Sequence, residues 1–234
     1  MKKQLVGIGM MGLLAACAAR AAETKPVAPG ACDQGKGESC VELGERYDSG
    51  TGVEKSPAKA LELYLQACKL DVARGCSHAG ELVMHGDGVP KDEANARALR
   101  EKACMLNDAI ACNNLGTAYS EGKEGVGGVD HAKARTFYEK SCKLDDGVGC
   151  FNLGNVYRLG EGVTIDLQQA LAEFQLACDL DAAMGCTEAA IIHIEGRAVP
   201  QDLAKAMALL EKGCRLGSAV ACKNRELLRD APKP

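Results

Sequence analysis

The sequence is poor in aromatic side chains. It has no tryptophan, and Phe, Trp and Tyr together make up 3% of its 234 residues. An apolar core must therefore be built mainly of Leu, Ala, Val and Ile. Basic stripes are also lacking, and the net charge of −4 comes from interspersed charges of both signs, which argues against nucleic acid as a partner.

Motifs for metals and cofactors are missing as well. The sequence contains no H-E-x-x-H zinc motif and no C-x-x-C-H haem motif, and its Gly-x-Gly strings do not have the context of a phosphate-binding loop. Its histidines share no column of the repeat described below and are predicted to be exposed or partly buried surface residues; they are His78, His85, His131 and His193. No cofactor and no metal site is predicted.

Cysteine, by contrast, is abundant, with 13 in the chain. All but one fall into pairs whose members are eight residues apart: Cys32 and Cys40, Cys68 and Cys76, Cys104 and Cys112, Cys142 and Cys150, Cys178 and Cys186, Cys214 and Cys222. The pairs recur every 36 residues, with a single step of 38. A fixed period of this length is typical of stacked supersecondary units and not of one globular core.

A cysteine pair at the same place in every unit favours disulfides that hold the stack together. Metal sites and reduced core thiols are the alternatives, but seven intervening residues do not match the two-residue spacing of zinc ribbons. Closing a loop of about eight residues contributes on the order of 2.5 kcal/mol in the chain-entropy model. The cysteines therefore predict an exported protein in an oxidising compartment.

Residues 1–16 have the layout of a bacterial secretory signal. Lys2 and Lys3 precede an apolar run over 5–16, which is too short to span a bilayer as a helix. The run ends in Leu-Ala-Ala-Cys, which resembles the lipobox of bacterial lipoproteins, and Cys17 is the cysteine without a partner.

Lipidation at Cys17 is therefore predicted, followed by a flexible tether over 17–31. A periplasmic lipoprotein held at the membrane by its lipid is the favoured location. An ordinary signal cut after Ala21, which would give a secreted protein, is the alternative.

Aligned on the second cysteine of each pair, the chain divides into units 38–73, 74–109, 110–147, 148–183 and 184–219, with a terminal capping half-unit at 220–234. A small residue stands seventh in each unit: Gly44, Gly80, Gly116, Gly154 and Ala190. An alanine follows later in each: Ala60, Ala96, Ala134, Ala170 and Ala206. A helix-capping residue lies four positions before each alanine: Ser56, Asp92, Asp130, Asp166 and Asp202. Each unit is therefore predicted to be a helix, a glycine turn, a capped second helix and a short loop.

The string Gly-Cys-Phe-Asn-Leu-Gly-Asn-Val-Tyr at 149–157, with Gly-Glu-Gly-Val at 160–163 and Cys178, resembles a Sel-one-like repeat, a relative of the tetratricopeptide repeat. The paired cysteines make the chain similar to the exported, cysteine-rich Hcp type. This resemblance implies an all-α, right-handed α-solenoid with a concave face. It also implies two functions, because some Hcp-type members are described as weak β-lactamases and others as protein-interaction scaffolds. Two extra residues in the turn 122–130 are expected to make that turn protrude.

Two S-x-x-K strings bear on the β-lactamase alternative. They are Ser56 with Lys59 and Ser120 with Lys123. Neither an S-D-N nor a K-T-G element accompanies them. Ser56 also occupies the capping column, so its hydroxyl has a structural role available. These residues are weak catalytic candidates.

The concave groove is the better candidate site. In the middle units its expected lining is polar: Asn113, Asn114, Thr117, Asn152, Asn155 and Arg158. Amides and one arginine suit an extended peptide or a terminal carboxylate, and the alternative is a solvated polar face. The favoured function is a cell-envelope scaffold that binds a protein or peptide ligand in this groove. The second hypothesis is a weak β-lactam hydrolase, with a β-lactam or cell-wall fragment as ligand.

Overall fold

The computed structural model describes residue 32 and residues 36–123 and 126–231, so the predicted signal, Cys17 and tether lie outside the described residues. Within the described residues the regular elements are eleven helices. In chain order they are α1 (Gly37–Ser49), α2 (Pro57–Lys69), α3 (Ala73–His85), α4 (Glu93–Met105), α5 (Ala109–Glu121), α6 (His131–Lys143), α7 (Gly147–Leu159), α8 (Leu167–Asp179), α9 (Ala183–Glu195), α10 (Leu203–Arg215) and α11 (Ala219–Asp230).

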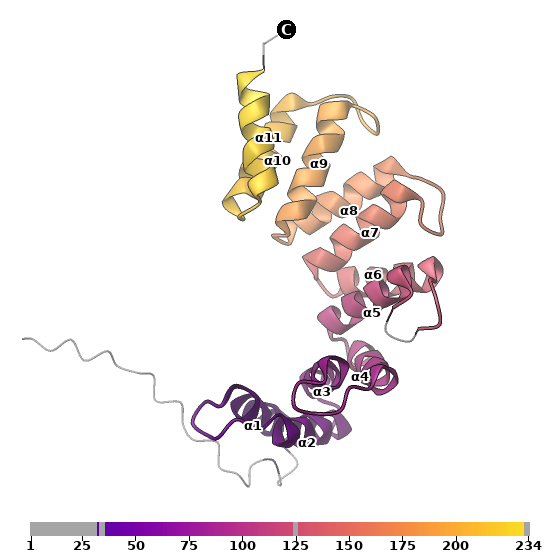
Figure 1. Cartoon of the computed structure of the whole chain (residues 1–234). Helices are drawn as coiled ribbons and strands as arrows, with labels where there is room; N and C mark the ends of the chain where they lie inside the picture. The colour runs from indigo at the N-terminus through magenta and orange to yellow at the C-terminus, as the bar shows by residue number, and fades with distance from the viewer. Residues whose placement is uncertain (1–31, 33–35, 124–125, 232–234) are drawn as a thin grey trace, which may run out of the picture.

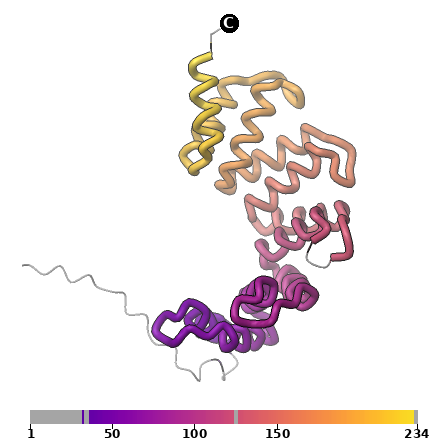
Figure 2. The backbone as a smooth tube through the Cα atoms, viewed as in Figure 1, coloured from indigo at the N-terminus to yellow at the C-terminus, as the bar shows by residue number. Residues whose placement is uncertain are grey.

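These helices form antiparallel hairpins that stack one on the next. Each odd-numbered helix packs against the even-numbered helix that follows it, and each even-numbered helix packs against the first helix of the next unit. Figures 1 and 2 show the stack as a curved rod with α1 and α11 at opposite ends. The predicted all-α solenoid of helical hairpins is confirmed.

Local sequence explains where the helices of a hairpin end and begin. Each first helix stops at a glycine in the left-handed region: Gly50, Gly86, Gly122, Gly160 and Gly196. Each second helix starts at the predicted capping residue, whose side chain accepts a backbone N–H bond from the first turn: Ser56, Asp92, Asp130, Asp166 and Asp202. Such a cap stabilises a helix by about 1 kcal/mol.

The loops after the second helices use a different left-handed residue. Asp71, Asn107, Asp145 and Asp181 all have positive φ, between 58° and 68°. Asn and Asp tolerate this conformation better than other residues with a Cβ, because their short polar side chains can hydrogen-bond locally. Left-handed turns were predicted from the sequence only at glycine, so this second set of left-handed residues was not predicted.

The column of small residues makes room for rings. A Cβ added to Gly154 would lie 2.6 Å from the Phe174 ring, and one added to Gly44 would lie 2.6 Å from the Tyr64 ring. Gly116 faces Tyr138 in the same way. Three of the eight aromatic residues thus stand where a first helix lacks a side chain, and the glycines allow these three hairpins to close around a ring.

All six predicted cysteine pairs are disulfides, with Cα–Cα distances of 4.5–4.8 Å. Apart from the bond at the N-terminal end, between Cys32 and Cys40, each joins the last turn of a second helix to the first turn of the next unit. These five bonds join Cys68 to Cys76, Cys104 to Cys112, Cys142 to Cys150, Cys178 to Cys186, and Cys214 to Cys222. The expected cross-linking of consecutive units is therefore confirmed.

One further expectation about the fold concerns the turn 122–130. This predicted protruding turn includes residues 124–125, which lie outside the described part of the chain. Its protrusion stays a prediction.

Candidate functional site

In both S-x-x-K strings the lysine ammonium group, of Lys59 or of Lys123, lies against another side chain. Ser56 accepts the backbone N–H of Lys59 at 3.4 Å as the cap of α2, while the Lys59 ammonium lies 5.2 Å from the centre of the Tyr47 ring. Lys123 Nζ lies 2.7 Å from the carboxylate of Glu121, and this hydrogen bond raises the pKa of Lys123. A lysine held in its protonated form is a poor base for activating a serine. Hydrolysis of β-lactams stays a prediction.

First helices of neighbouring units contact one another: α1 meets α3, α5 meets α7, α7 meets α9, and α9 meets α11. In a curved stack the elements that lie closest together are on the inside of the curve. We therefore define the inner face as the surface formed by the odd-numbered helices α1 to α11. The groove residues predicted from sequence lie on α5 and α7, which are both part of it.

Two of the predicted groove residues bond to each other across units. Asn152 Nδ2 on α7 donates to Asn113 Oδ1 on α5 at 2.8 Å, and both side chains are half-buried. A side-chain amide has more than one donor and acceptor position, so this pair has capacity beyond the bond that joins it. The inner face thus has an amide bridge between its third and fourth units.

The other predicted groove residues divide into two kinds. Arg158 donates two hydrogen bonds to Asn155 Oδ1, at 3.2 and 2.8 Å, which fixes its guanidinium on the surface of α7. The Thr117 hydroxyl donates to the backbone carbonyl of Asn113 at 3.2 Å and accepts from the Tyr138 hydroxyl at 3.3 Å. Thr117 therefore serves the packing of its own hairpin, whereas Arg158 and Asn155 form a polar pair.

Asn114 lines a hollow of about 280 Å³ between α3 and α5, together with Arg74, His78, Arg100 and Ile110. Arg100 is only 6% exposed and occupies the position at which α2, α6 and α8 hold an aromatic ring. This hollow was not predicted from the sequence. The signal was present in the aligned units, where one arginine stands in a column of Tyr, Phe and Leu.

A charged network covers the N-terminal part of the inner face. His78 lies 3.4 Å from the carboxylate of Glu45 and 3.6 Å from that of Glu81, and Arg74 pairs with Glu45 and Glu38. The hydrogen bond that His78 donates to the Glu81 carboxylate raises the pKa of His78 against the opposing effect of burial, and the same bond lowers the pKa of Glu81. The network therefore favours a protonated imidazole between two carboxylates.

Exposed apolar residues follow one another along the rest of the inner face. They occupy the second position of α5, α7, α9 and α11: Ile110, Val148, Met184 and Val220, with exposures of 65%, 41%, 50% and 58%. We call these four residues the apolar column. They also head the aligned units, so the column was visible in the sequence, but nothing there showed that it stays exposed.

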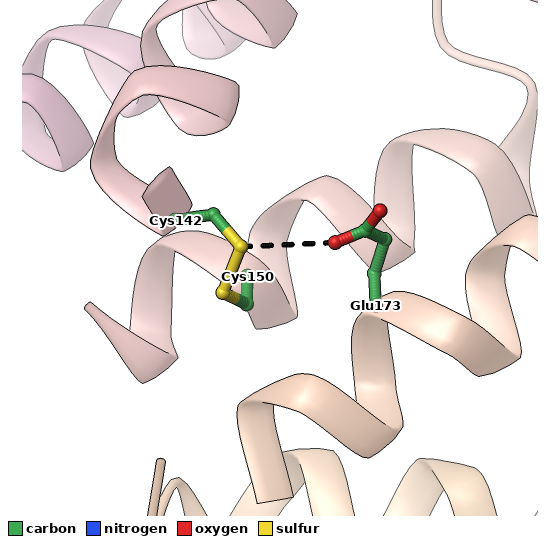
Figure 3. A group of neighbouring side chains, drawn as sticks. All are labelled: Cys142, Cys150 and Glu173. Atoms are coloured by element: carbon green, nitrogen blue, oxygen red, sulfur yellow. Dashed lines mark hydrogen bonds between the residues drawn. A yellow bond between two sulfur atoms is a disulfide. The ribbon is translucent and has the colours of Figure 1, made fainter. Parts of the chain in front are cut away.

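One sulfur–carboxylate group lies elsewhere, between α6, α7 and α8. In the part of the chain that is described, Cys142, Cys150 and Glu173 form the one cluster of metal-ligating side chains, with ligand atoms within 4.8 Å of one another (Figure 3). Both sulfurs belong to a disulfide, and a disulfide sulfur lacks the thiolate that metals require. The absence of a metal site stays a prediction. Over the described residues, no helix is long and apolar enough to cross a membrane.

Hairpins built of helices of equal length, glycine turns and a disulfide at each junction define the class of protein: a disulfide-stapled α-solenoid of helical-hairpin repeats. More specifically, this chain belongs to the Sel1 repeat family, which matches residues 37–72, 73–108, 109–146, 147–181 and 183–218. The predicted family is confirmed, and the regular cysteine pairs fit its cysteine-rich Hcp type. No curated protein sequence matches this chain.

Two solved structures with TM-scores above 0.7 agree with this assignment. A Sel1 repeat protein from Oxalobacter formigenes is 25% identical, with a TM-score of 0.75 over 82% of this chain and 77% of that one. The protective antigen c5321 of uropathogenic Escherichia coli is 26% identical, with a TM-score of 0.77 over 87% of this chain and 43% of its own. Helicobacter pylori cysteine-rich protein B is 32% identical over 59% of this chain and 98% of its own, with a TM-score of 0.47.

Proposed function

We propose that this protein is an interaction scaffold of the bacterial cell envelope, and that its inner face binds an extended segment of a partner protein. The observation that carries the proposal is the apolar column, which runs along α5, α7, α9 and α11 beside the half-buried amides of the middle units. An extended peptide needs hydrogen bonds for its backbone and pockets for some of its side chains. Amides and an apolar column on one face supply both.

Rigidity supports the same function. A disulfide at each junction holds neighbouring units in one arrangement, so little conformational entropy is lost when a partner binds. The hollow between α3 and α5 opens beside Ile110, the first residue of the apolar column, and its volume of about 280 Å³ suits one anchoring side chain of the partner. Charged residues of both signs line it, Arg74 and Arg100 together with Glu81 and Asp108, so the anchor has a polar rim around it.

Photo-crosslinking in intact cells tests this proposal. A photoreactive phenylalanine analogue replaces Val148 on the inner face, and in a matched control it replaces Leu176 on α8, which has nearly the same exposure (41% against 43%). We expect the inner position to crosslink one discrete protein, identified by mass spectrometry, and the outer position not to do so. Equal crosslinking from both positions would contradict the proposed face.

The amide and arginine groups provide the second arm of the test. Asn152→Ala combined with Arg158→Ala removes the amide bridge and the polar pair, and we expect it to raise the dissociation constant of the identified partner by about tenfold, the loss of one or two hydrogen bonds. Circular dichroism should show an unchanged helix content. If the double variant binds the partner with unchanged affinity, Asn152 and Arg158 are not part of the binding surface.

The envelope location rests on the disulfides and on the N-terminal sequence. Six disulfides need an oxidising compartment, and the lipobox-like string before Cys17 supplies an anchor. In cells fed a labelled fatty acid, we expect the wild type to be labelled and to sediment with membranes, and Cys17→Ala to lose the label. An unlabelled wild type would leave the ordinary secretory signal as the explanation, and a labelled Cys17→Ala protein would show that the lipid is attached at another residue.

A further inference from the structure

Glu173 breaks the pattern of the column to which it belongs. The residue three positions after the alanine of each second helix is apolar in every other unit: Leu63, Leu99, Phe137 and Leu209. Two of these, Leu99 and Phe137, pack against the buried cluster that contains the disulfide cysteines of the two preceding junctions. At the next junction along the chain, which holds Cys142 and Cys150, the equivalent residue is Glu173 and carries a carboxyl group.

That carboxyl lies directly against the disulfide. Glu173 Oε2 is 3.7 Å from Cys142 Sγ, as Figure 3 shows, and the carboxylate is within 4.8 Å of both sulfurs. Cys142 and Glu173 line one pocket of about 290 Å³, together with Glu139, Lys143 and Tyr157. Cys142 therefore lines a pocket that is open to solvent, and its sulfur has a carboxyl group beside it.

The surroundings of Glu173 favour its protonated form. Burial raises the pKa of its carboxyl, the Glu139 carboxylate on α6 raises it further, and the hydrogen bond from Gln169 on α8 opposes both. Lys143 on α6 and Tyr157 on α7 are the other ionisable groups that face the pocket. A neutral carboxyl can donate its proton to a sulfur that becomes negative.

We propose that Cys142–Cys150 is a thiol–disulfide exchange site, at which a dithiol reductant attacks Cys142 and Glu173 supplies the proton for the departing sulfur. This inference is independent of what binds the inner face. Reduction of this disulfide would remove the cross-link between the third and fourth units, which are also joined by the bridge between Asn113 and Asn152.

The chemistry follows ordinary thiol–disulfide exchange. A thiolate of the dithiol attacks Cys142 Sγ, forming a mixed disulfide, while the bond to Cys150 breaks and its sulfur leaves with the electron pair. Glu173 protonates this sulfur and regains a proton from solvent. The second thiol of the reductant then closes on the first, which releases Cys142 as a thiol. The dithiol is oxidised by two electrons, and the cysteine pair is reduced by two.

The test compares two disulfides in the same molecule. The oxidised full chain is treated with dithiothreitol at pH 5.5 and pH 8.0, and thiols are trapped by alkylation at timed intervals and assigned by mass spectrometry. Cys104–Cys112 is the internal control, because the apolar Phe137 stands in the position equivalent to Glu173 and packs against the cluster that contains these cysteines. Both disulfides are exposed to the same concentration of dithiothreitol thiolate. The terminal pair Cys214–Cys222 is set aside, since both of its cysteines are partly exposed.

We expect the ratio of the two reduction rates, Cys142–Cys150 over Cys104–Cys112, to be about ten or more at pH 5.5, a modest effect for general-acid catalysis. The ratio should fall at pH 8.0, where an ionised Glu173 no longer donates and repels the incoming thiolate. Glu173→Gln should give a smaller ratio that does not change with pH, and Glu173→Leu a ratio near one.

Three outcomes would overturn the proposal. If the ratio of the two reduction rates in the wild type is one or below at pH 5.5, Cys142–Cys150 does not exchange preferentially. If the Glu173→Gln protein has the wild-type pH profile, Glu173 is not the proton donor. A Glu173→Leu protein that keeps the wild-type ratio shows that the carboxyl plays no part. Circular dichroism of each variant verifies the helix content, and the equivalent leucines of other units indicate that Glu173→Leu folds.

Discussion

Replacing Glu173 by leucine should stabilise this protein. The column to which Glu173 belongs holds a leucine or phenylalanine in the other units, and its own side chain is half-buried next to a disulfide. Full burial of a leucine side chain contributes about 1.5–3 kcal/mol, so partial burial at this position should contribute about 1 kcal/mol. Removing a carboxyl whose charged form is disfavoured by burial adds to this gain, and we expect about 1–2 kcal/mol at neutral pH.

The gain should depend on pH in a defined direction. The folded pKa of Glu173 is raised above its ordinary value of 4.5. The wild type therefore loses stability as pH rises through the folded pKa, because the unfolded chain ionises this group more easily. Leucine has no such loss, so the advantage of Glu173→Leu should be larger at pH 7.5 than at pH 4.0.

Thermal unfolding of the oxidised protein, followed by circular dichroism, measures both effects. For a chain of this size, each kcal/mol corresponds to roughly 2–4 °C in the midpoint temperature. Glu62→Leu is the matched control, because Glu62 is exposed on α2 beside Leu63, and its effect should stay within about 0.5 kcal/mol. A Glu173→Leu midpoint at or below that of the wild type at pH 7.5, or an equal gain at both pH values, would refute this reasoning.

Other substitutions test separate parts of the fold. Gly154→Ala places a Cβ 2.6 Å from the Phe174 ring and should destabilise the protein by about 1–3 kcal/mol, measured by urea unfolding. Ser56→Ala removes the cap of α2 and should cost about 1 kcal/mol in the same assay. The raised pKa of His78 means that its pairing with Glu81 stabilises the fold below pH 6.5 and that this contribution is lost as pH rises through the raised value. His78→Gln should therefore destabilise the protein more at pH 5.5 than at pH 8.5.

Each of these expectations has a contrary result. A neutral Gly154→Ala would mean that the helices of a hairpin can move apart at little cost. A neutral Ser56→Ala would mean that solvent replaces the cap. An effect of His78→Gln that is independent of pH would assign His78 a packing role and no electrostatic one.

Local and periodic features of the fold were predictable from the sequence. Caps such as Asp92 act within one helical turn, and Cys178 and Cys186 are only eight residues apart, so a short loop alone brings them together. Repetition then added evidence, because each column was seen in several units. The left-handed role of Asp71 was missed, since aspartate is common in loops of every conformation and leaves no distinct signal.

The candidate site was only partly predictable. The alignment of units placed Asn113 and Asn152 on equivalent helices, and the structure joins them. The same alignment contained Arg100 and Ile110, but their columns do not reveal that one lies buried at a hollow and the other stays exposed beside it. The burial of a side chain depends on how the neighbouring hairpins pack over it, and the sequence of a single unit does not determine that packing.

The sequence by itself determined the repeat, the hairpin, the capped helices and the cysteine pairing, because these depend on residues close together in the chain. Only the tertiary structure decided which side chains of different units meet. Asn152 reaches Asn113 across 39 residues, and Glu173 reaches Cys142 across 31. Such contacts follow from the twist and stagger between stacked hairpins, which arise from the packing of whole helices and not from any local pattern.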